Sequence, residues 1–484
     1  MSDLIKVGLD FGTHQTKICV QRTPDEGHGE PIYEFFQFED LKGRKSYFLP
    51  SVIQINEDDT LSYGYVNPEK EKHTIPLPQK EEVIFNDFSP EEEAKVLLNK
   101  YLCSRDSEKN ISSLVKMLKI KQQKDLNAYQ AQCANAEKTY REKLKEYRNK
   151  RYIYRYFKQA TFAERPWEKD LDSILLSIWY LAYVIFKLEE VFGTNFATNM
   201  GIPADDLMFE KKRTLAVSVL ASAYRLVEDV YNNNLDVFLN ETIDSLKLKT
   251  KILPYSPSLK DKYNINIFPE AYASLITLTT KGKLTPGMSL TVDIGGGTTD
   301  ISFFIIKHND KFPDIYKYWS IQRGLNYIAE ESGFDYSEGD FNLNCENEVV
   351  EKFNNKKMEI VGNLIKKLIS KLSTETKIPK EFLLSRLIDR TVVYAGGGNI
   401  YANLSTPVSY FTEIHRINSN MWKEERITDK NAVIDACYLL TVAYGLSLAE
   451  KESDVKLCSL ESIFTHLSGN KEDFGDKFID KDAV

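Results

Sequence analysis

A glycine-rich segment in the middle of the chain most constrains the fold. The apolar run Leu290-Thr291-Val292-Asp293-Ile294 is followed by three glycines, and Thr298-Thr299-Asp300 then opens a second apolar run. This order predicts two β-strands joined by a tight turn. Glycines let backbone N–H groups converge on one anion, and the flanking carboxylates would repel a phosphate unless a cation lay between them. The segment therefore predicts a hairpin that binds nucleotide phosphates together with Mg²⁺.

The N-terminal segment repeats this order. An apolar run that starts at Ile5 leads into Asp10-Phe11-Gly12-Thr13-His14, and a second apolar run begins near Ile18. One such segment is equally typical of an ordinary β-hairpin, because glycine and aspartate are common in turns. Two copies with the same order favour a pair of related phosphate-binding hairpins.

A third glycine cluster follows the β-branched run that ends at Ala395. Gly396-Gly397-Gly398-Asn399 lies at the end of that run, as is typical where a backbone approaches a ligand closely. The order and spacing of the three clusters resemble those of the actin, DnaK-type heat-shock chaperone and sugar-kinase superfamily. Members of that superfamily hold ATP between two phosphate hairpins and an adenosine loop. The resemblance implies that the cluster at Gly396 is the adenosine loop.

Other segments resemble the DnaK-type chaperones in particular. The second hairpin has their D-x-G-G-G-T-x-D form, and the match extends discontinuously over about residues 4–450. The further matching segments are Leu49-Pro50-Ser51-Val52, Ser62-Tyr63-Gly64, Ser112 to Leu118, Asn199 to Ala204, the helix from Lys211 to Glu228, Phe268 to Leu275 and Ala436 to Ala449. Since only about 35 residues follow the last of them, the peptide-binding domain of the chaperones has no counterpart in this sequence.

The resemblance implies an α/β fold class with two related actin-like ATPase domains of ribonuclease H-like fold and a nucleotide cleft between them. The expected first domain covers residues 1–284, with a helical insertion lobe at about 49–170. The second would cover residues 285–430, with a small lobe at about 326–388. Residues 431–452 would be a helix that crosses back to the first domain, and residues 453–484 a charged tail.

The same resemblance implies how ATP or ADP and Mg²⁺ would be bound. Asp10, Asp293 and Asp300 would surround the metal, largely through its water molecules, because Mg²⁺ dehydrates reluctantly. The hydroxyls of Thr13 and Thr298 would add donors to the phosphates. The backbone amides expected to hold the β- and γ-phosphates are those of Gly12, Thr13, His14, Gly295, Gly296 and Gly297, and the expected adenosine contacts are Gly396, Gly397, Gly398 and Asn399.

Two further side chains complete the catalytic set for slow hydrolysis of ATP to ADP and phosphate. Glu270 matches the carboxylate that orients the attacking water, with a simple charge at a helix N-terminus as the alternative. Lys116 is the candidate phosphate-contacting lysine, with an exposed helix lysine as the alternative. Together with Asp10, Asp293 and Thr298 these residues form the expected catalytic set.

The sequence departs from the chaperone pattern at two of these places. His14 stands where the chaperones have a small hydroxyl residue. Gly398-Asn399 stands where they usually have a hydroxyl residue and an arginine on adenine. The adenine contacts therefore stay open.

A basic helical insertion is the expected partner surface. No glycine or proline occurs from Ser112 to Arg165, and apolar residues recur at intervals of three and four, which predicts a long helix or a helical hairpin. Between Lys138 and Lys158 nine bases face only two acids. Such a helix is often just a solvated face. As a partner surface, residues 121–160 favour a protein over a nucleic acid, since the chain has a net charge of −8, and an oligomer is a further option.

Composition excludes several other classes of protein. The six cysteines include no C-x-x-C pair or zinc-like spacing with histidine, so neither a disulfide framework nor a metal site of that kind is indicated. The N-terminus lacks the pattern of a signal segment, and no apolar run of membrane-spanning length is evident in the sequence. These features predict a cytoplasmic protein with no membrane association.

Three functions fit these features. The first is an ATP-driven conformational switch, chaperone-like, that regulates a protein partner. The second is a nucleotide-dependent, actin-like filament former, which would share every motif. The third is a small-molecule kinase of the sugar-kinase type, which would need a catalytic base facing a sugar pocket, and the sequence offers no candidate for that base.

Overall fold

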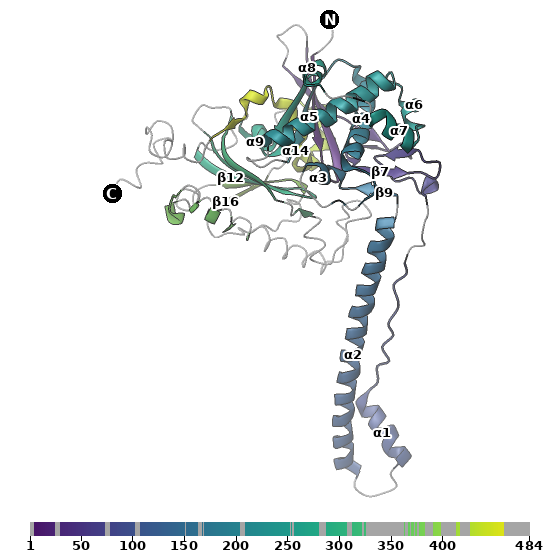
Figure 1. Cartoon of the computed structure of the whole chain (residues 1–484). Helices are drawn as coiled ribbons and strands as arrows, with labels where there is room; N and C mark the ends of the chain where they lie inside the picture. Colours follow the sequence, from purple (N-terminus) through teal and green to yellow (C-terminus); the bar gives the residue numbers. More distant parts are fainter. Residues whose placement is uncertain are drawn as a thin grey trace, which may run out of the picture. The chain divides into compact units, whose positions relative to one another are not determined.

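The computed structural model shows a mixed α/β protein with several sheets (Figure 1). It describes residues 4–325 and 426–458, except for 25–29, 73–77, 102–106, 151, 163–166, 168, 204–208, 252, 254–255, 280–286, 307–311 and 322–323, together with 391–397, 413–416 and parts of 363–382. The chain divides into two compact units. Unit 1 comprises Met1–Lys70 and Tyr154–Val484, and unit 2 comprises Glu71–Ile153.

The first sheet of unit 1 is built around the N-terminal hairpin. Its strand order is β11-β10-β1-β2-β3, and a short strand, β6, also pairs with β2. β1 runs antiparallel to β2 and parallel to β10, while β10 and β11 are parallel. The strands are β1 (Leu4–Phe11), β2 (Gln15–Thr23), β3 (Ile32–Phe35), β6 (Leu49–Pro50), β10 (Ala197–Ile202) and β11 (Ile265–Pro269).

The second sheet repeats this arrangement around the second hairpin. Its order is β16-β15-β12-β13-β14-β17, with β12, β13 and β14 antiparallel and β12, β15 and β16 parallel. Apart from β17 at its edge, the order and strand directions match those of the first sheet, so unit 1 contains an internal repeat of topology. The strands are β12 (Gly287–Ile294), β13 (Thr299–Ile306), β14 (Asp314–Ile321), β15 (Thr391–Ala395), β16 (Glu413–Arg416) and β17 (Lys456–Leu457).

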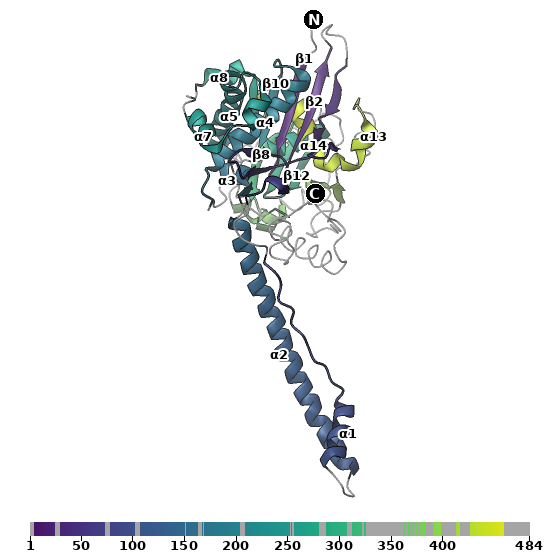
Figure 2. The same ribbon diagram turned by 90° about the vertical axis from the view of Figure 1, so that its right-hand side faces the viewer.

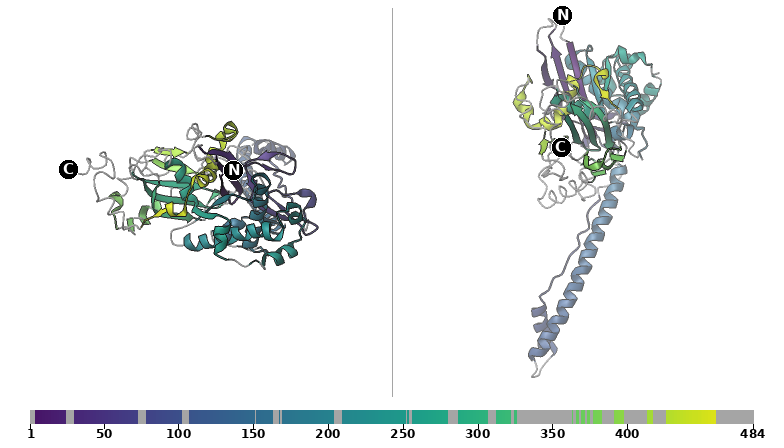
Figure 3. Two further views of the ribbon diagram at one scale, coloured as in Figure 1. Left: turned by 90° about the horizontal axis from the view of Figure 1, so that it is seen from above. Right: turned by 90° about the vertical axis from the view of Figure 1, so that its left-hand side faces the viewer.

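Two helices lie between these sheets (Figure 3). α9 (Glu270–Thr279) packs on β12 and β13, and α14 (Cys437–Leu448) packs on β1, β2 and α9. Glycines allow the close approach, because a Cβ on Gly445 would lie 1.8 Å from the carbonyl oxygen of Ala273 and one on Gly8 would lie 2.3 Å from that of Ala443. The two helices therefore meet each other, and α14 meets β1 of the first sheet, with backbone against backbone.

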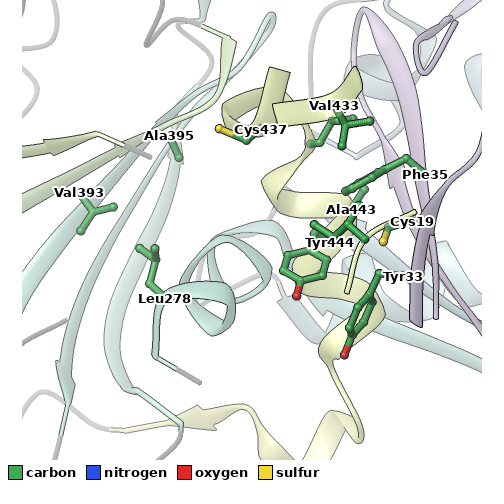
Figure 4. Close-up of a cluster of buried hydrophobic side chains, with 12 residues drawn as sticks. Cys19, Tyr33, Phe35, Leu278, Val393, Ala395, Val433, Cys437, Ala443 and Tyr444 are labelled. Carbon is green, nitrogen blue, oxygen red and sulfur yellow. The ribbon is translucent and has the colours of Figure 1, made fainter. Parts of the chain in front are cut away.

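A buried cluster fills the space around α14 (Figure 4). Side chains of the first sheet, of α9 and of β15 meet those of α14 and of the turn before it. The cluster consists of Cys19, Tyr33, Phe35, Leu278, Val393, Ala395, Ile427, Val433, Cys437, Leu440, Ala443 and Tyr444. Burial of this much apolar surface is what holds the two sheets and the helix pair together.

Further helices and small sheets complete unit 1. α4 covers Ser173–Phe192, and Asp172 caps it by accepting a hydrogen bond from the Ile174 amide at 2.8 Å. α5 covers Phe209–Arg225 and continues as a π-helical turn, η2 (Leu226–Val230). The remaining elements are β4 (Phe38–Glu39), β5 (Lys45–Ser46), β7 (Val52–Ile55), β8 (Leu61–Tyr63), η1 (Pro68–Lys70), β9 (Ile153–Arg155), α3 (Phe157–Phe162), α6 (Leu235–Leu239), α7 (Ile243–Lys251), α8 (Ser258–Lys262), α13 (Lys430–Val433), η5 (Ile434–Ala436) and η6 (Glu452–Asp454).

Unit 2 is a helical hairpin with an extended strap along it (Figure 2). α1 (Pro90–Tyr101) packs against α2 (Ser107–Lys150). The strap before α1 is tied to α2 by Gln122, whose side chain donates to Asp87 Oδ1 and to the carbonyl oxygen of Phe88, each at 2.8 Å. The rings of Phe85 and Tyr129 lie 4.9 Å apart. Unit 2 lies inside the lobe predicted at about 49–170.

The helix predicted to continue toward Arg165 ends at Lys150. The strand β9 follows, and Tyr156 then has a φ of +63°, a left-handed conformation that a helix does not contain. The absence of glycine and proline was therefore insufficient to predict continuity. Alternating aromatic and basic residues, Arg151-Tyr152-Ile153-Tyr154-Arg155, favour a strand instead.

The C-terminal expectations are met only in part. The predicted tail begins inside the fold, because β17 pairs with β14 and the Cys458 amide donates to the carbonyl oxygen of Ile315 at 2.8 Å. Residues 459–484 lie outside the described residues, as does most of the small lobe predicted at about 326–388.

Among the described residues, one helical stretch is long and apolar enough to cross a membrane, judged by its length and composition alone. It runs from Lys430 to Leu448, and half of it is buried in the structure. This corrects the expectation that no apolar run reaches that length. The evidence for a membrane is weak, because the core helix of a globular protein meets the same criteria and α14 is such a helix here.

Candidate functional site

The two predicted hairpins form at the ends of β1 and β12. Their turns are closed from within, since the Gly12 amide donates to the carbonyl oxygen of Asp10 at 3.0 Å and the Gly295 amide to that of Thr298 at 2.9 Å. These two amides were expected to hold phosphate. In this structure they stabilise the turns, so the predicted amide cradle depends mainly on the next residues of each turn.

The fold brings the two hairpins together. A Cβ built on Gly296 would lie 2.0 Å from His14 Cδ2, and one on Gly297 would lie 2.6 Å from Gln159 Oε1. Gln159, in α3, also donates from Nε2 to the carbonyl oxygen of Gly297 at 2.9 Å. A side chain at Gly296 would collide with the His14 ring, whereas one at Gly297 would displace only the end of the Gln159 side chain, so Gly296 is the more constrained of the two.

The third glycine cluster reaches the same place. Gly396 follows β15 with a φ of +81°, and a Cβ there would lie 2.2 Å from Asp293 Oδ1. Gly397 is the next described residue, whereas Gly398 and Asn399 lie outside the described residues. The three clusters, far apart in sequence, therefore meet at one site, although the adenosine contacts themselves stay predictions.

Glu270 is the first residue of α9 and is buried. Its Oε1 accepts a hydrogen bond from Lys158 Nζ at 2.5 Å, and the Lys158 side chain is 4% exposed. Burial raises the pKa of Glu270, while the positive charge of Lys158 opposes that rise and the negative charge of Asp10 adds to it. A buried ion pair thus stands where the sequence predicts the water-orienting carboxylate.

Asp10 is held by a second ion pair. Lys17, opposite it on β2, donates from Nζ to Asp10 Oδ2 at 2.8 Å. Ser51 fixes the turn, because its hydroxyl donates to the carbonyl oxygen of Gly12 and its amide to that of His14, each at 2.7 Å. The first hairpin therefore presents one carboxylate that is already neutralised.

The second hairpin carries two carboxylates instead. Burial raises the pKa of Asp293 well above its ordinary value, and the negative charges of Asp300, Glu270 and Asp10 raise it further. Burial likewise raises the pKa of Asp300 to about 7, with a further contribution from Glu270. Thr298 donates to Asp300 Oδ2 at 3.2 Å, a contact that favours the ionised form.

The donor set fits a hydrated cation. Four carboxylates, those of Asp10, Glu270, Asp293 and Asp300, face two lysines, and Asp300 Oδ1 is buried with no hydrogen-bond partner among the described residues. Over the described ranges, no three acidic, histidine or cysteine side chains lie close enough to bind one ion directly. The residues therefore fit Mg²⁺ held largely through its waters, and do not form a cage of direct ligands.

One predicted site residue belongs to unit 2, and three residues of the site were missed. Lys116 is an exposed residue of α2 in unit 2, and its expected contact with phosphate stays a prediction. The lysine paired with Glu270 is Lys158, and neither it nor Lys17 nor Gln159 was predicted. Lys158 was counted as one base of a surface helix, because its role depends on a contact across 112 residues of chain.

Comparisons with known proteins supply no family for this chain. Neither the models of known protein families nor the curated proteins give a match. The functional argument therefore depends on the motifs and on the geometry of this site.

Proposed function

We propose that the chain is a Mg²⁺-dependent ATPase of the actin and DnaK-type superfamily. Unit 1 would contain its two ribonuclease H-like domains, one around each sheet, with ATP or ADP between the glycine hairpins. The observation that carries the proposal is the meeting of both hairpins, the Gly396 cluster and the Lys158–Glu270 pair at one site. The repeated strand order of the two sheets supports the two-domain interpretation.

The residues of the site have distinct roles in this proposal. Asp10, Asp293 and Asp300 hold the water shell of Mg²⁺, which when bound neutralises phosphate charge. Glu270 orients the attacking water, and Lys158 fixes its carboxylate and lies within the same buried site. Thr298, beside Asp300, supplies a hydroxyl to the phosphates. Because the transferred phosphoryl group needs positioning and charge stabilisation, these roles account for hydrolysis.

Nucleotide binding would change the angle between the two sheets. α9 and α14 contact both of them, and Glu270 is the first residue of α9, so closure around a nucleotide would be transmitted through these helices. The change would regulate a protein partner, and we propose the cytoplasm as its location. This is the switch function expected from the sequence.

Unit 2 is the proposed partner surface, and the exposed residues near the start of α2 suit that role better than the basic residues predicted at 121–160. Of the basic residues predicted at 121–160, Lys143 pairs with Glu81 at 3.9 Å and Lys158 is buried in unit 1. Nearer the start of α2, Met117 and Ile120 are 65% and 54% exposed. Exposed apolar residues one turn apart on a lysine-rich helix suit a protein partner.

The test is ATP binding and single-turnover hydrolysis, with Mg²⁺ and after chelation. The parent protein is compared with Asp10→Asn, Asp293→Asn and Glu270→Ala. We expect Glu270→Ala to bind ATP without hydrolysing it, and the aspartate variants to lose metal-dependent hydrolysis. A parent protein that binds no nucleotide would refute the proposal. Light scattering with MgATP and an assay for sugar phosphorylation separate the switch from the filament former and the sugar kinase.

A further inference from the structure

One edge of the His14 imidazole ring lies against the second hairpin. A Cβ built on Gly296 would lie 2.0 Å from Cδ2, 2.7 Å from Nε2 and 3.0 Å from Cγ of the His14 ring. The Cδ2–Nε2 edge of the imidazole therefore faces the glycine turn, with Cδ2 nearest and Nε2 beside it. Because Gly296 has no side chain, the ring fits between the two hairpins.

The ring and its backbone are held from two other directions. The Tyr156 ring meets the imidazole edge-on, with centroids 5.6 Å apart and an angle of 77° between the planes. Tyr156 has a φ of +63°, an unusual conformation for a large side chain and one that is typical of functional sites. Ser51 donates its amide hydrogen to the His14 carbonyl oxygen at 2.7 Å. The position of the imidazole is thus fixed by three separate segments.

The facing turn is also the part of the second hairpin tied to the Lys158–Glu270 pair. Gln159, the residue after Lys158, donates to the carbonyl oxygen of Gly297 at 2.9 Å. A phosphoryl group attacked by water at Glu270 would therefore lie close to Gly296 and Gly297. The Nε2 edge of His14 faces that same position.

The charge balance of the site favours a cationic imidazole there. Four carboxylates face only two lysines, and a nucleotide would add further negative charge. An imidazolium N–H on a phosphate oxygen forms a charge-assisted hydrogen bond, which is stronger than a neutral one. The small hydroxyl residue found at this position in the chaperones could supply no such charge.

We propose that His14 binds the terminal phosphate of ATP through Nε2 and makes ATP binding stronger at low pH, so that it sets the preference for ATP over ADP. This inference rests on the proposed function. Other charged or titratable groups face the imidazole, and they change the local charge without replacing its contact. Of these, Tyr156 contacts the ring, and the others belong to the segments around it: Asp10 and Lys17 of its own hairpin, Lys158 of α3, Glu270 of α9, and Asp293 and Asp300 of the second hairpin.

The test measures the affinity for a non-hydrolysable ATP analogue and for ADP, both with Mg²⁺, by calorimetry at about pH 6 and about pH 8. We expect the parent to bind the analogue about tenfold more tightly at the lower pH, and ADP with little change. His14→Gln keeps an N–H donor near the position of Nε2 but carries no charge, so it should lose the pH dependence. His14→Phe keeps a ring without a donor and should weaken analogue binding about tenfold at the lower pH.

Two further measurements separate this inference from its alternatives. Asp300 titrates in the same pH range and belongs to the proposed metal site, so Asp300→Asn with His14 intact should bind the analogue more weakly at both pH values but must keep the ratio between them. Thermal unfolding checks that the parent, His14→Gln and His14→Phe are all folded. Equal affinity of the three for the analogue would then overturn the role of His14 and leave the proposed function standing. A parent that binds neither nucleotide would refute the proposed function, and this inference with it.

Discussion

Asp293 and Asp300 lie directly opposite each other on β12 and β13, whereas the equivalent pair of the first hairpin is Asp10 and Lys17. Like charges at directly opposite positions destabilise a sheet, and both aspartates are buried. The first hairpin neutralises its carboxylate with a lysine of the chain. The second hairpin has no such neighbour among its described residues, so it depends on protons, or on a cation from solution, for its neutralisation.

The first prediction concerns the stability of the metal-free protein. The pKa of Asp300 is about 7 in the fold against an ordinary value of 3.8, so the native state binds the proton more strongly. Stability should therefore fall as pH rises between these values, and Asp300→Asn should escape that loss. One pKa unit corresponds to about 1.4 kcal/mol. We therefore expect the free energy of unfolding of Asp300→Asn to exceed that of the parent by about 2–4 kcal/mol at about pH 8. Urea unfolding in chelator at several pH values measures this difference.

Glu189 supplies a matched control for that measurement. Burial raises its pKa to about 7, with a contribution from Glu228, and neither of its carboxylate oxygens has a hydrogen-bond partner among the described residues. Glu189→Gln should likewise escape the loss of stability that its carboxylate causes as pH rises, and so should be more stable than the parent at about pH 8. Because Glu189 lies in α4, away from the glycine turns, adding Mg²⁺ and ATP should stabilise Glu189→Gln as much as the parent but Asp300→Asn less. Equal responses in the two variants would contradict a metal role for Asp300.

The second prediction concerns the buried ion pair. Lys158→Met removes the partner of Glu270 and leaves a buried carboxylate without its cation. Breaking a buried pair from one side costs about 3–5 kcal/mol, and protonation of Glu270 should limit the loss to about 3 kcal/mol. Denaturant unfolding without nucleotide measures the loss, and single-turnover assays should show hydrolysis at least about 100-fold slower.

The double variant Lys158→Met with Glu270→Gln tests whether the pair acts as a unit. Once no charge remains buried, much of the lost stability should return, and the two single effects should fail to add. Hydrolysis should stay lost in the double variant. If the effects on stability add instead, the 2.5 Å contact between Lys158 and Glu270 contributes little in solution.

The hairpins were predictable because local chemistry specifies them. Asp10 and Asp293 come at the ends of apolar runs, and glycine is needed within each turn whatever the rest of the chain does. The start of α9 at Glu270 was expected from the resemblance of Phe268 to Leu275 to the chaperone segment, and the structure begins the helix at that residue. The order of the remaining strands does not follow from the hairpins alone, because β10, β11, β15 and β16 come from distant parts of the chain.

The lysines of the site were not predictable in this way. Lys158 belongs to the short helix α3, where its sequence neighbours Phe157 and Gln159 are buried, and only the tertiary fold brings it to Glu270. Lys17 follows the polar residues Gln15 and Thr16 at the start of β2, where a lysine is ordinarily exposed. The break after Lys150 carries no glycine or proline, so the change from helix to strand depends on the aromatic run that follows.

The third prediction concerns Glu452, which ties the segment after α14 to β11. Its Oε1 accepts from the Ile267 amide at 2.7 Å, and its Oε2 accepts from Lys260 at 2.6 Å and Arg213 at 3.4 Å. Glu452→Ala leaves the Ile267 amide and Lys260 without this acceptor, while Arg213 keeps its ion pair with Glu210, and should cost about 1–3 kcal/mol, measured by denaturant unfolding. Glu452→Gln keeps an acceptor for Ile267 and should cost less.

Glu452 should also affect hydrolysis, because Ile267 lies three residues before Glu270 on the same strand and helix start. We expect Glu452→Ala to slow single-turnover hydrolysis several-fold with unchanged affinity for ATP. A change in affinity with no change in hydrolysis would contradict this positioning role.

The last prediction separates the two units. The chain enters and leaves unit 2 at neighbouring points, because Lys72 Nζ lies 5.1 Å from the centre of the Tyr152 ring. A short glycine-serine linker in place of residues 73–151 should therefore let unit 1 fold and bind ATP as the parent does, while capture of the protein partner is lost. If circular dichroism shows that unit 1 of this variant is folded, loss of ATP binding would mean that unit 2 contributes to the nucleotide site. Met117→Ser with Ile120→Ser should lose the partner too, whereas Val191→Ser, equally exposed on α4, should retain it, since only the first pair lies on unit 2.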